Sequence, residues 1–306
     1  MFLAPMDGYT DAAFRKLCQR LGAEYAYTEL ISAVGYAAGV PVTVSKSFVP
    51  KDDRSGLQFF GADPKAFRPA VEKLEDDIAN GITFPKSIDL NMGCPMRNVM
   101  RMGAGAALLK TPSKVDSILT EMEKSSLPVS VKMRIGIASK NGWKKFVPVL
   151  NRHGLQHITV HARTQEEKYM GKGHWELTKD IASSFKHPVV INGNVNCEED
   201  AERLIKSGAA NVMVGRAALT NPFIFRSTGE NRNTNRSANK NAGMNTNMNI
   251  SMNTYANAKK TIELYKKLAK KYKCEDDVQL LRIKMKLFSG FEGAKEIRKH
   301  VHERDE

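Results

Sequence analysis

A short apolar strand that ends in an asparagine and a cysteine is the stretch with the clearest chemistry. It reads Ser87-Ile88-Asp89-Leu90-Asn91-Met92-Gly93-Cys94-Pro95, and its apolar residues alternate up to Asn91. Gly93 and Pro95 then forbid further pairing in a sheet. The Cys94 thiol is thereby placed just beyond a strand end, where α/β proteins bind their ligands. An amide and a thiol delivered together to that edge indicate a site. The alternative is a buried cysteine in a tight turn.

The residues at the ends of the other expected strands are mostly polar or glycine. They are Pro5 and Met6, Thr28 and Glu29, Gln58, Lys132 and Arg134, His161 and Arg163, Asn192, Gly193 and Asn194, and Gly215 and Arg216. Each has a structural explanation when taken singly, since a lysine can cap a carbonyl, a histidine can be satisfied in a core and a glycine can close a turn. Together they predict an active site at the carboxyl edge of the strands. Gly193 and Gly215, with the charge of Arg216, predict a phosphate site after the last two strands.

Eight short strands must position these side chains. We expect them at 2–6, 25–30, 56–60, 87–91, 129–133, 158–161, 189–192 and 211–215. Alternation with helices over residues 2–226 and nearly continuous apolar strands predict an α/β fold, a closed parallel (β/α)8 TIM barrel. A doubly wound open sheet is the alternative.

Helical spacing predicts the segments between the strands. Helices are expected at 10–21, from 64 onward, at 143–153, at 175–185 and at 198–207. Thr10 is the expected N-cap of the first helix and Gly22 its end. Gly103 and Gly105, after the cysteine strand, either form a mobile segment over the site or allow close packing.

Composition narrows the class of protein. The 306 residues are 42% hydrophobic and 26% charged, enough for one large domain and a small appendage. No long apolar run or basic leader occurs, so we expect a cytoplasmic protein with no membrane span. Four cysteines without CxxC spacing argue against a metal site or disulfides. A net charge of +14 favours a polyanionic partner.

The last quarter of the chain differs from the rest. Ten asparagines fall between residues 231 and 257, with no helical or strand periodicity, which predicts a disordered linker or insert over 227–257. Residues 258–306 return to helical spacing at 258–272, 278–288 and 294–301, with Ile262, Tyr265, Leu268 and Ala269 facing inward. This region holds 14 Lys or Arg against 9 Asp or Glu. Its lysine face is either solvated surface or a nucleic-acid contact.

Five segments resemble the signature of the tRNA-dihydrouridine synthases. They are residues 3–11 (LAPMDGYTD), 89–95 (DLNMGCP), 131–134 (VKMR), 160–164 (VHART) and 213–216 (MVGR). The resemblance covers residues 2–226. It implies an FMN-binding barrel at 1–226, a basic helical tRNA-binding domain at 258–306, and reduction of the 5,6 double bond of uridines in tRNA, with NADPH as electron source. A monomer is expected.

Site residues follow from the resemblance position by position. Cys94 would protonate uracil C5, while Asn91 and Arg163 would orient the base. The flavin would be held by Pro5, Met6, Gln58, Lys132, His161, Asn192, Gly193, Asn194, Gly215 and Arg216. The types suit the chemistry, because a thiol is protonated near neutral pH and a cationic Lys132 would stabilise an anionic reduced flavin. Arg163 and Tyr169 could clasp a base swung out of the RNA.

One departure from the family pattern lies in this set, since Asn194 stands where the family usually has aspartate. Two other functions remain open. One is a flavin-dependent barrel that reduces a free small molecule, against which the basic helical tail argues. The other is a non-catalytic RNA-binding barrel, against which the intact Cys94, Lys132, His161 and Arg163 argue.

Overall fold

Eight parallel strands form a barrel in the computed structural model, which describes residues 1–226, 255–274 and 276–287. The strands are β1 (Phe2–Leu3), β2 (Ala26–Ser32), β3 (Ser55–Phe60), β4 (Ile88–Met92), β5 (Val129–Gly136), β6 (Ile158–Thr164), β7 (Val189–Asn192) and β8 (Asn211–Val214). Each strand from β2 to β7 pairs with the next, and β8 pairs with β1. The ring closes where Leu3 N–H donates to the Tyr25 carbonyl at 2.8 Å. The predicted (β/α)8 barrel is confirmed.

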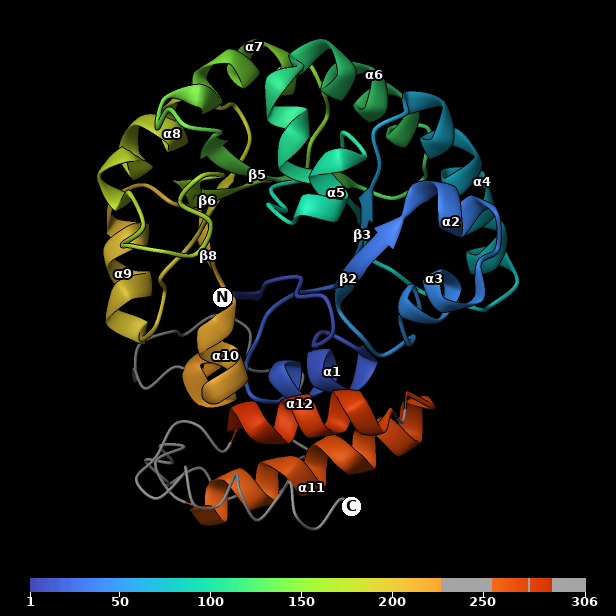
Figure 1. Cartoon of the computed structure of the whole chain (residues 1–306). Coiled ribbons are helices and arrows are strands. Elements are labelled where there is room, and N and C mark those ends of the chain that lie inside the picture. Colours follow the sequence, from blue (N-terminus) through green and yellow to red (C-terminus); the bar gives the residue numbers. More distant parts are fainter. Residues whose placement is uncertain (227–254, 275, 288–306) are drawn as a thin grey trace.

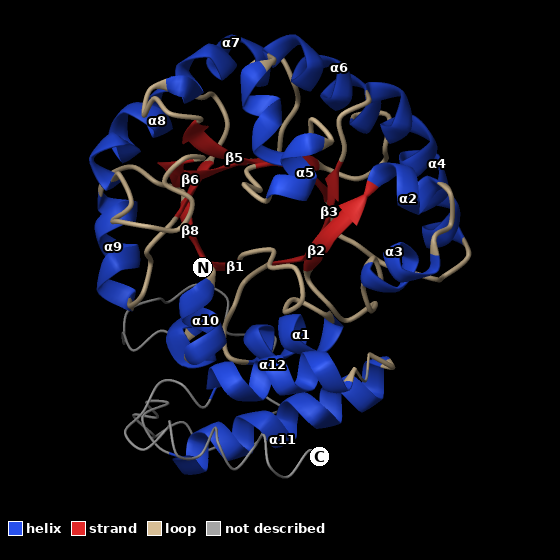
Figure 2. Ribbon diagram, viewed as in Figure 1, coloured by secondary structure: helices blue, strands red, loops and turns tan. Residues whose placement is uncertain are grey.

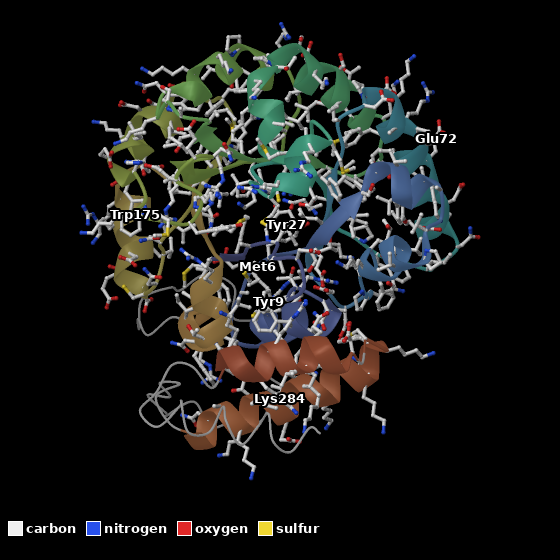
Figure 3. The ribbon with its side chains drawn as sticks, in the orientation of Figure 1. Met6, Tyr9, Tyr27, Glu72, Trp175 and Lys284 are labelled. Carbon is white, nitrogen blue, oxygen red and sulfur yellow. The ribbon has the colours of Figure 1, made fainter. Side chains whose placement is uncertain are left out.

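Helices surround the strands (Figure 1; Figure 2). The α-helices up to residue 226 are α1 (Ala12–Arg20), α2 (Ala33–Ala37), α3 (Pro41–Lys46), α4 (Phe67–Ala79), α5 (Arg97–Arg101), α6 (Pro112–Met122), α7 (Val147–Leu150), α8 (Thr178–Ser184), α9 (Glu198–Lys206) and α10 (Arg216–Thr220). Short 3-10 turns are η1 (Pro64–Ala66), η2 (Gly105–Lys110), η3 (Gly142–Phe146), η4 (Trp175–Leu177) and η5 (Pro222–Phe225). Figure 3 shows Glu72 on the outer ring and Met6 over the middle of the barrel. No described helix has the length and apolar character that a membrane span requires.

The first helix begins one residue later than expected, because its N-cap is Asp11 and not Thr10. The Asp11 carboxylate accepts the Phe14 N–H at 2.7 Å. The Thr10 hydroxyl instead donates to the Met6 carbonyl and accepts the Met6 N–H. Both residue types can cap a helix, and here Thr10 closes the turn after β1.

Strands β5 and β6 run further than their apolar patterns suggest. They end at Gly136 and Thr164, beyond the expected Met133 and His161. The added residues include two buried arginines, Arg134 and Arg163, which donate hydrogen bonds to nearby backbone carbonyls. Apolar periodicity could not show these ends, since each extension contains an arginine, Arg134 on β5 and Arg163 on β6.

The Gly103–Gly105 segment packs closely. Gly105 has φ +59°, and a Cβ there would meet the Cys94 carbonyl oxygen at 2.8 Å. The Ala106 N–H donates to the same carbonyl at 3.0 Å. Of the two alternatives for these glycines, the structure therefore supports close packing for Gly105, directly behind the cysteine.

Two C-terminal helices, α11 (Tyr255–Tyr272) and α12 (Asp277–Leu287), lie along the outside of the barrel beside α1 (Figure 1). The predicted inward face of α11 is buried, with Ile262, Tyr265, Leu268 and Ala269 each at most 5% exposed. The Tyr265 hydroxyl donates to Asp11 at 2.7 Å, which fixes this helix to the first barrel helix. The predicted linker, apart from residues 255–257, and the expected helix at 294–301 lie outside the described residues.

Candidate active site

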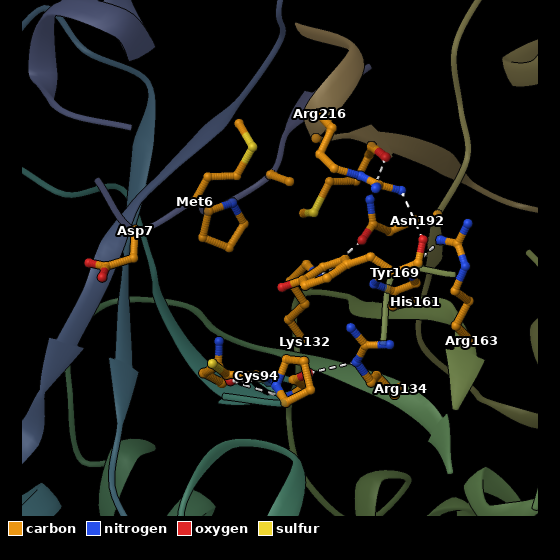
Figure 4. Close-up of a pocket in the computed structure, with 18 of the residues that line it drawn as sticks. Met6, Asp7, Cys94, Lys132, Arg134, His161, Arg163, Tyr169, Asn192 and Arg216 are labelled. Carbon is orange, nitrogen blue, oxygen red and sulfur yellow. Dashed lines mark hydrogen bonds between the residues drawn. The ribbon is translucent and has the colours of Figure 1, made fainter. Parts of the chain in front are cut away.

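A cavity of about 420 Å³ opens at the carboxyl end of the strands (Figure 4). The register of the strands decides which residues are neighbours in its wall. Asn91 on β4 is paired with Lys132 on β5, and His161 on β6 is paired with Asn192 on β7. Twelve of the residues predicted from the sequence line it, namely Pro5, Met6, Asn91, Cys94, Lys132, His161, Arg163, Asn192, Gly193, Asn194, Gly215 and Arg216. Residues from strand ends far apart in the sequence thus meet in one hollow.

Cys94 is half-buried in this wall, in a turn fixed by its neighbour on β4. Oδ1 of Asn91 accepts the backbone N–H groups of Gly93 at 3.1 Å and Cys94 at 3.0 Å. Burial raises the pKa of the Cys94 thiol above its usual value. The side chain is therefore a protonated thiol at neutral pH, with a proton available to the cavity.

Gln58, assigned above to the flavin, does not line the cavity. It is fully buried beneath it, where Nε2 donates to Asp89 at 2.7 Å and Oε1 accepts Nδ2 of Asn91 at 2.8 Å. Asp89 also accepts the Ser130 hydroxyl at 2.6 Å. Because Asp89 only accepts when ionised, it fixes the orientation of the Gln58 amide, and Gln58 in turn fixes that of Asn91. Gln58 is thus the middle of a relay from Asp89 to the cysteine turn.

Positive charge dominates the cavity. Its charged lining consists of one carboxylate, Asp7, and four cations, Lys132, Arg134, Arg163 and Arg216. Burial, helped by Arg134, lowers the pKa of Lys132 to about 8. Lys132 Nζ donates to Oδ1 of Asn192 at 3.1 Å, and Asn192 donates to the Met213 carbonyl at 2.7 Å. The lysine is held toward the last two strands and remains largely protonated at pH 7.

His161 is neutral in this surrounding. Burial lowers its pKa well below 6.5, and the nearby cations Lys132, Arg134, Arg163 and Arg216 lower it further. Arg163 Nη1 lies 3.1 Å from His161 Nε2. Since a guanidinium only donates, Nε2 is the acceptor and the imidazole proton is on Nδ1.

The predicted phosphate region lies at the ends of β7 and β8. Gly193 has φ +111°, and a Cβ there would come within 2.8 Å of the His161 ring, so only glycine fits. At Gly215 an added Cβ would meet no atom closer than 3.6 Å, which leaves its cavity side open. Arg216 begins α10 directly after it and lies over the Tyr169 ring at 5.4 Å. Open backbone beside a guanidinium is suited to an anionic group.

Arg163 is buried and its donors are already occupied. Nε donates to the Met170 carbonyl at 2.9 Å, and Nη2 donates to the Gly171 carbonyl at 2.6 Å and to Oδ1 of Asn194. Asn194 has φ +62°, a conformation that asparagine tolerates. Its side-chain oxygen supplies the acceptor here, so the departure from aspartate leaves this contact in place.

Arg134 is one of the strand-end residues named above, and the family resemblance assigns it no role. It is 1% exposed and lines the cavity, with Nε donating to the Gly93 carbonyl at 2.7 Å and Nη1 to the carbonyls of Thr164 and Lys168. A signal was available, because residues two apart on a strand share a face and Lys132 was already assigned. Asp7 and Tyr169 also line the cavity.

The whole chain, from residue 2 to 305, matches the family model described as "Dihydrouridine synthase (Dus)". This chain belongs to the dihydrouridine synthase family. A probable tRNA-dihydrouridine synthase of Aquifex aeolicus is 35% identical over 239 residues, covering 76% of this chain and 73% of the relative. The tRNA-dihydrouridine synthase B of Pasteurella multocida is 31% identical over 232 residues, covering 74% and 68%.

Two solved structures resemble this chain in fold. The crystal structure of TcOYE with pHBA has a TM-score of 0.52 at 10% identity and covers 73% of this chain and 87% of its own. The old yellow enzyme homologue from Zymomonas mobilis has a TM-score of 0.50 at 12% identity and covers 72% and 86%. At these identities the likeness concerns the barrel alone. The dihydrouridine synthase family assignment rests on the sequence matches.

Proposed function

We propose that this chain is a tRNA-dihydrouridine synthase, an oxidoreductase that reduces the 5,6 double bond of uridine in tRNA. The observation that carries the proposal is Cys94, a thiol kept protonated by burial on the wall of a cation-lined cavity, in a member of the dihydrouridine synthase family. Reduction of the double bond requires a hydride at one carbon and a proton at the other. The chain's own part is to supply the proton and to fix the base.

The cavity is suited to FMN. Four cations against one carboxylate, together with open backbone at Gly215, fit a phosphate-bearing group. When bound, the flavin supplies the hydride. Arg216 and the backbone at Gly193 and Gly215 would hold its phosphate. Pro5, Met6, Lys132, His161, Asn192 and Asn194 would hold the rest. Gln58 would act only through Asn91, since it lies beneath the cavity.

Each polar residue at the wall has a role in the proposed reaction. Cys94 gives its proton to uracil C5. Asn91 holds the cysteine turn with Oδ1, and its place on the wall also suits contact with the base. Arg163 shapes the pocket by holding the segment 170–171 and Asn194. Lys132 provides a positive charge near the ring, which favours its reduced, anionic form.

Further parts of the proposal concern the surroundings of the reaction. NADPH would supply the electrons, and a nicotinamide must then reach the same open cavity. The protein would act as a monomer in the cytoplasm, with the lysines of the C-terminal helices against the tRNA. The exposed side chains of Lys260, Lys267 and Lys270 on α11 are available for such contacts.

The decisive experiment maps dihydrouridine in tRNA from cells that lack this protein. Loss of the modified base at one or more positions, restored by the wild-type chain, supports the proposal. A purified protein without flavin absorbance, or one that turns over free uridine as well as tRNA, would contradict it. The second result would indicate an oxidoreductase for small molecules built on the same barrel.

A further inference from the structure

Exposed apolar side chains gather on two segments that flank the cavity mouth. Nine large hydrophobic side chains are exposed among the described residues, and four of them belong to these segments. They are Met96 (55% exposed), Met102 (58%), Tyr169 (46%) and Met170 (76%), which we call the methionine rim. Met96 and Tyr169 also line the cavity, which places the rim at its opening. Single exposed apolar residues are ordinary, but such a concentration beside a site indicates a binding surface.

Basic side chains accompany the rim on both segments. Arg97 and Arg101 are exposed on α5, which lies over the barrel in Figure 1, and Lys168 and Lys172 are exposed across the mouth. Within the described part of the chain, none of these four makes a side-chain hydrogen bond or ion pair. Glu166 is the exposed carboxylate of the same loop. The surface therefore combines apolar contact with unpaired positive charge, which fits a polyanion with apolar faces.

The two segments are tied together from below. Buried Arg134 donates from Nε to the Gly93 carbonyl, just before α5, at 2.7 Å. Its Nη1 donates to the carbonyls of Thr164 at 2.8 Å and Lys168 at 2.7 Å, in the facing loop. Its guanidinium also lies 5.4 Å from the centre of the Tyr169 ring. The rim is thus positioned before any ligand arrives, which lowers the entropic cost of binding.

We propose that the methionine rim contacts the nucleotides on either side of the target uridine, an inference that rests on the proposed function. A uridine in folded RNA must leave its stack to reach the cavity, and its neighbours then expose their base faces. Methionine is flexible and polarisable, so it packs on base faces of different shapes, and apolar wedges of this kind separate stacked bases in other complexes. The adjacent Arg and Lys side chains would neutralise the flanking phosphates.

The test measures binding to tRNA purified from cells that lack the protein, with Met102→Gln and Met170→Gln combined in the full flavin-bound chain. Neither side chain lines the cavity, and Met170 holds Arg163 only through its backbone carbonyl, so flavin content should not change. We expect affinity to fall by about tenfold, on the scale of one lost base contact. The slope of log affinity against log salt should stay the same, because no phosphate contact is lost.

Matched variants separate base contact from general surface effects. Met102→Leu with Met170→Leu keeps apolar contact and should bind within about twofold of wild type. Ile82→Gln removes a side chain that is 50% exposed at the opposite end of the barrel and should have no effect. Arg101→Gln should instead lower the salt slope, by about 0.7 for one phosphate.

Two results would overturn the inference, and a third would refute the proposed function on which it rests. Wild-type affinity in the double glutamine variant would overturn it. Unchanged tRNA binding with a raised KM for NADPH in flavin bleaching would assign the rim to the dinucleotide and also overturn it. Dihydrouridine formation, measured on the same samples, distinguishes failure of this inference from failure of the proposed function. A wild-type chain that forms no dihydrouridine would refute the proposed function itself.

Discussion

Asn91 and Cys94 are joined by a hydrogen bond in which the backbone N–H of Cys94 donates to Oδ1 of Asn91 at 3.0 Å. The same oxygen accepts the Gly93 N–H, so one amide side chain fixes the turn that carries the thiol. The amide is itself held by Gln58. The direction in which Cys94 faces the cavity is therefore set from the floor of the barrel.

Replacing Cys94 by serine should affect only the step that reduces the base. Serine keeps nearly the same shape but is a far weaker acid. Flavin content and bleaching by NADPH should survive. Recovery of flavin absorbance on adding tRNA should slow by about 10² to 10⁴, the usual loss for a positioned general acid. Anaerobic stopped-flow absorbance follows the two half-reactions separately.

Cys197→Ser is the matched control, since Cys197 is an exposed thiol at the start of α9. It should leave both half-reactions at wild-type rates. Recovery at the wild-type rate in Cys94→Ser would show that another group or a water gives the proton, and Cys94 would then be only a turn residue.

Gln58→Leu distinguishes two roles for Gln58. If the relay is correct, the substitution frees the Asn91 amide, and base reduction should slow by about tenfold while the Kd for FMN stays within about twofold. Loss of the buried partners of Asp89 and Asn91 should also cost about 1–3 kcal/mol of unfolding free energy. Fluorescence titration of flavin-free protein measures the Kd. A strongly raised Kd with a normal rate of base reduction would instead support direct contact with the flavin.

Asp11 should make stability depend on pH. Burial raises its pKa from 3.8 to about 6, although the Phe14 N–H and Tyr265 hydroxyl stabilise the charged form. Between these values the folded chain holds a proton that the unfolded chain releases. Its contribution to stability is therefore present below pH 4 and is lost as the pH rises to about 6.

Asp11→Asn should remove this loss and raise the unfolding free energy at pH 7 by up to about 3 kcal/mol, at 1.36 kcal/mol per pKa unit. Asparagine can still cap α1. Urea unfolding at pH 4, 5, 6 and 7 gives the comparison. Asp63→Asn, at an exposed cap, should leave the pH profile of wild type unchanged. A profile for Asp11→Asn parallel to that of wild type would refute the assignment.

Exposed lysines of α11 should dominate the salt dependence of tRNA binding. Changing Lys260, Lys267 and Lys270 to glutamine should lower the log–log slope by about 0.7 for each lysine that contacts a phosphate. Lys179, Lys186 and Lys206, exposed on the helices and loops around α8 and α9, form a control set whose replacement should leave the slope alone. Equal effects from both sets would show that the lysines of α11 act only through the overall positive charge of the protein and not by contacting tRNA phosphates. Point variants are preferable to truncation, since α11 covers α1 and its loss would uncover that face.

The sequence by itself determined the barrel and most of the residues that line its cavity. Eight short apolar strands, most of them ending in polar residues, suffice to predict parallel strands whose carboxyl ends meet, and twelve of the thirteen assigned residues do line one cavity. This works because a parallel barrel brings every strand end to the same face, whatever the loops between them do.

Only the tertiary structure decided how those residues are used. Gln58 was assigned with the strand ends, yet it lies two residues before the end of β3, in register with Asp89, and its hydrogen bond to Asp89 holds it below the cavity. Arg163 and Arg134 donate to backbone carbonyls of loops that no periodicity describes, Gly171 for Arg163 and Gly93 and Lys168 for Arg134. The cap of α1 went to Asp11 because Thr10 was needed to close the preceding turn. A hydrogen bond depends on distances between segments remote in the chain, and a one-dimensional pattern holds no such distances.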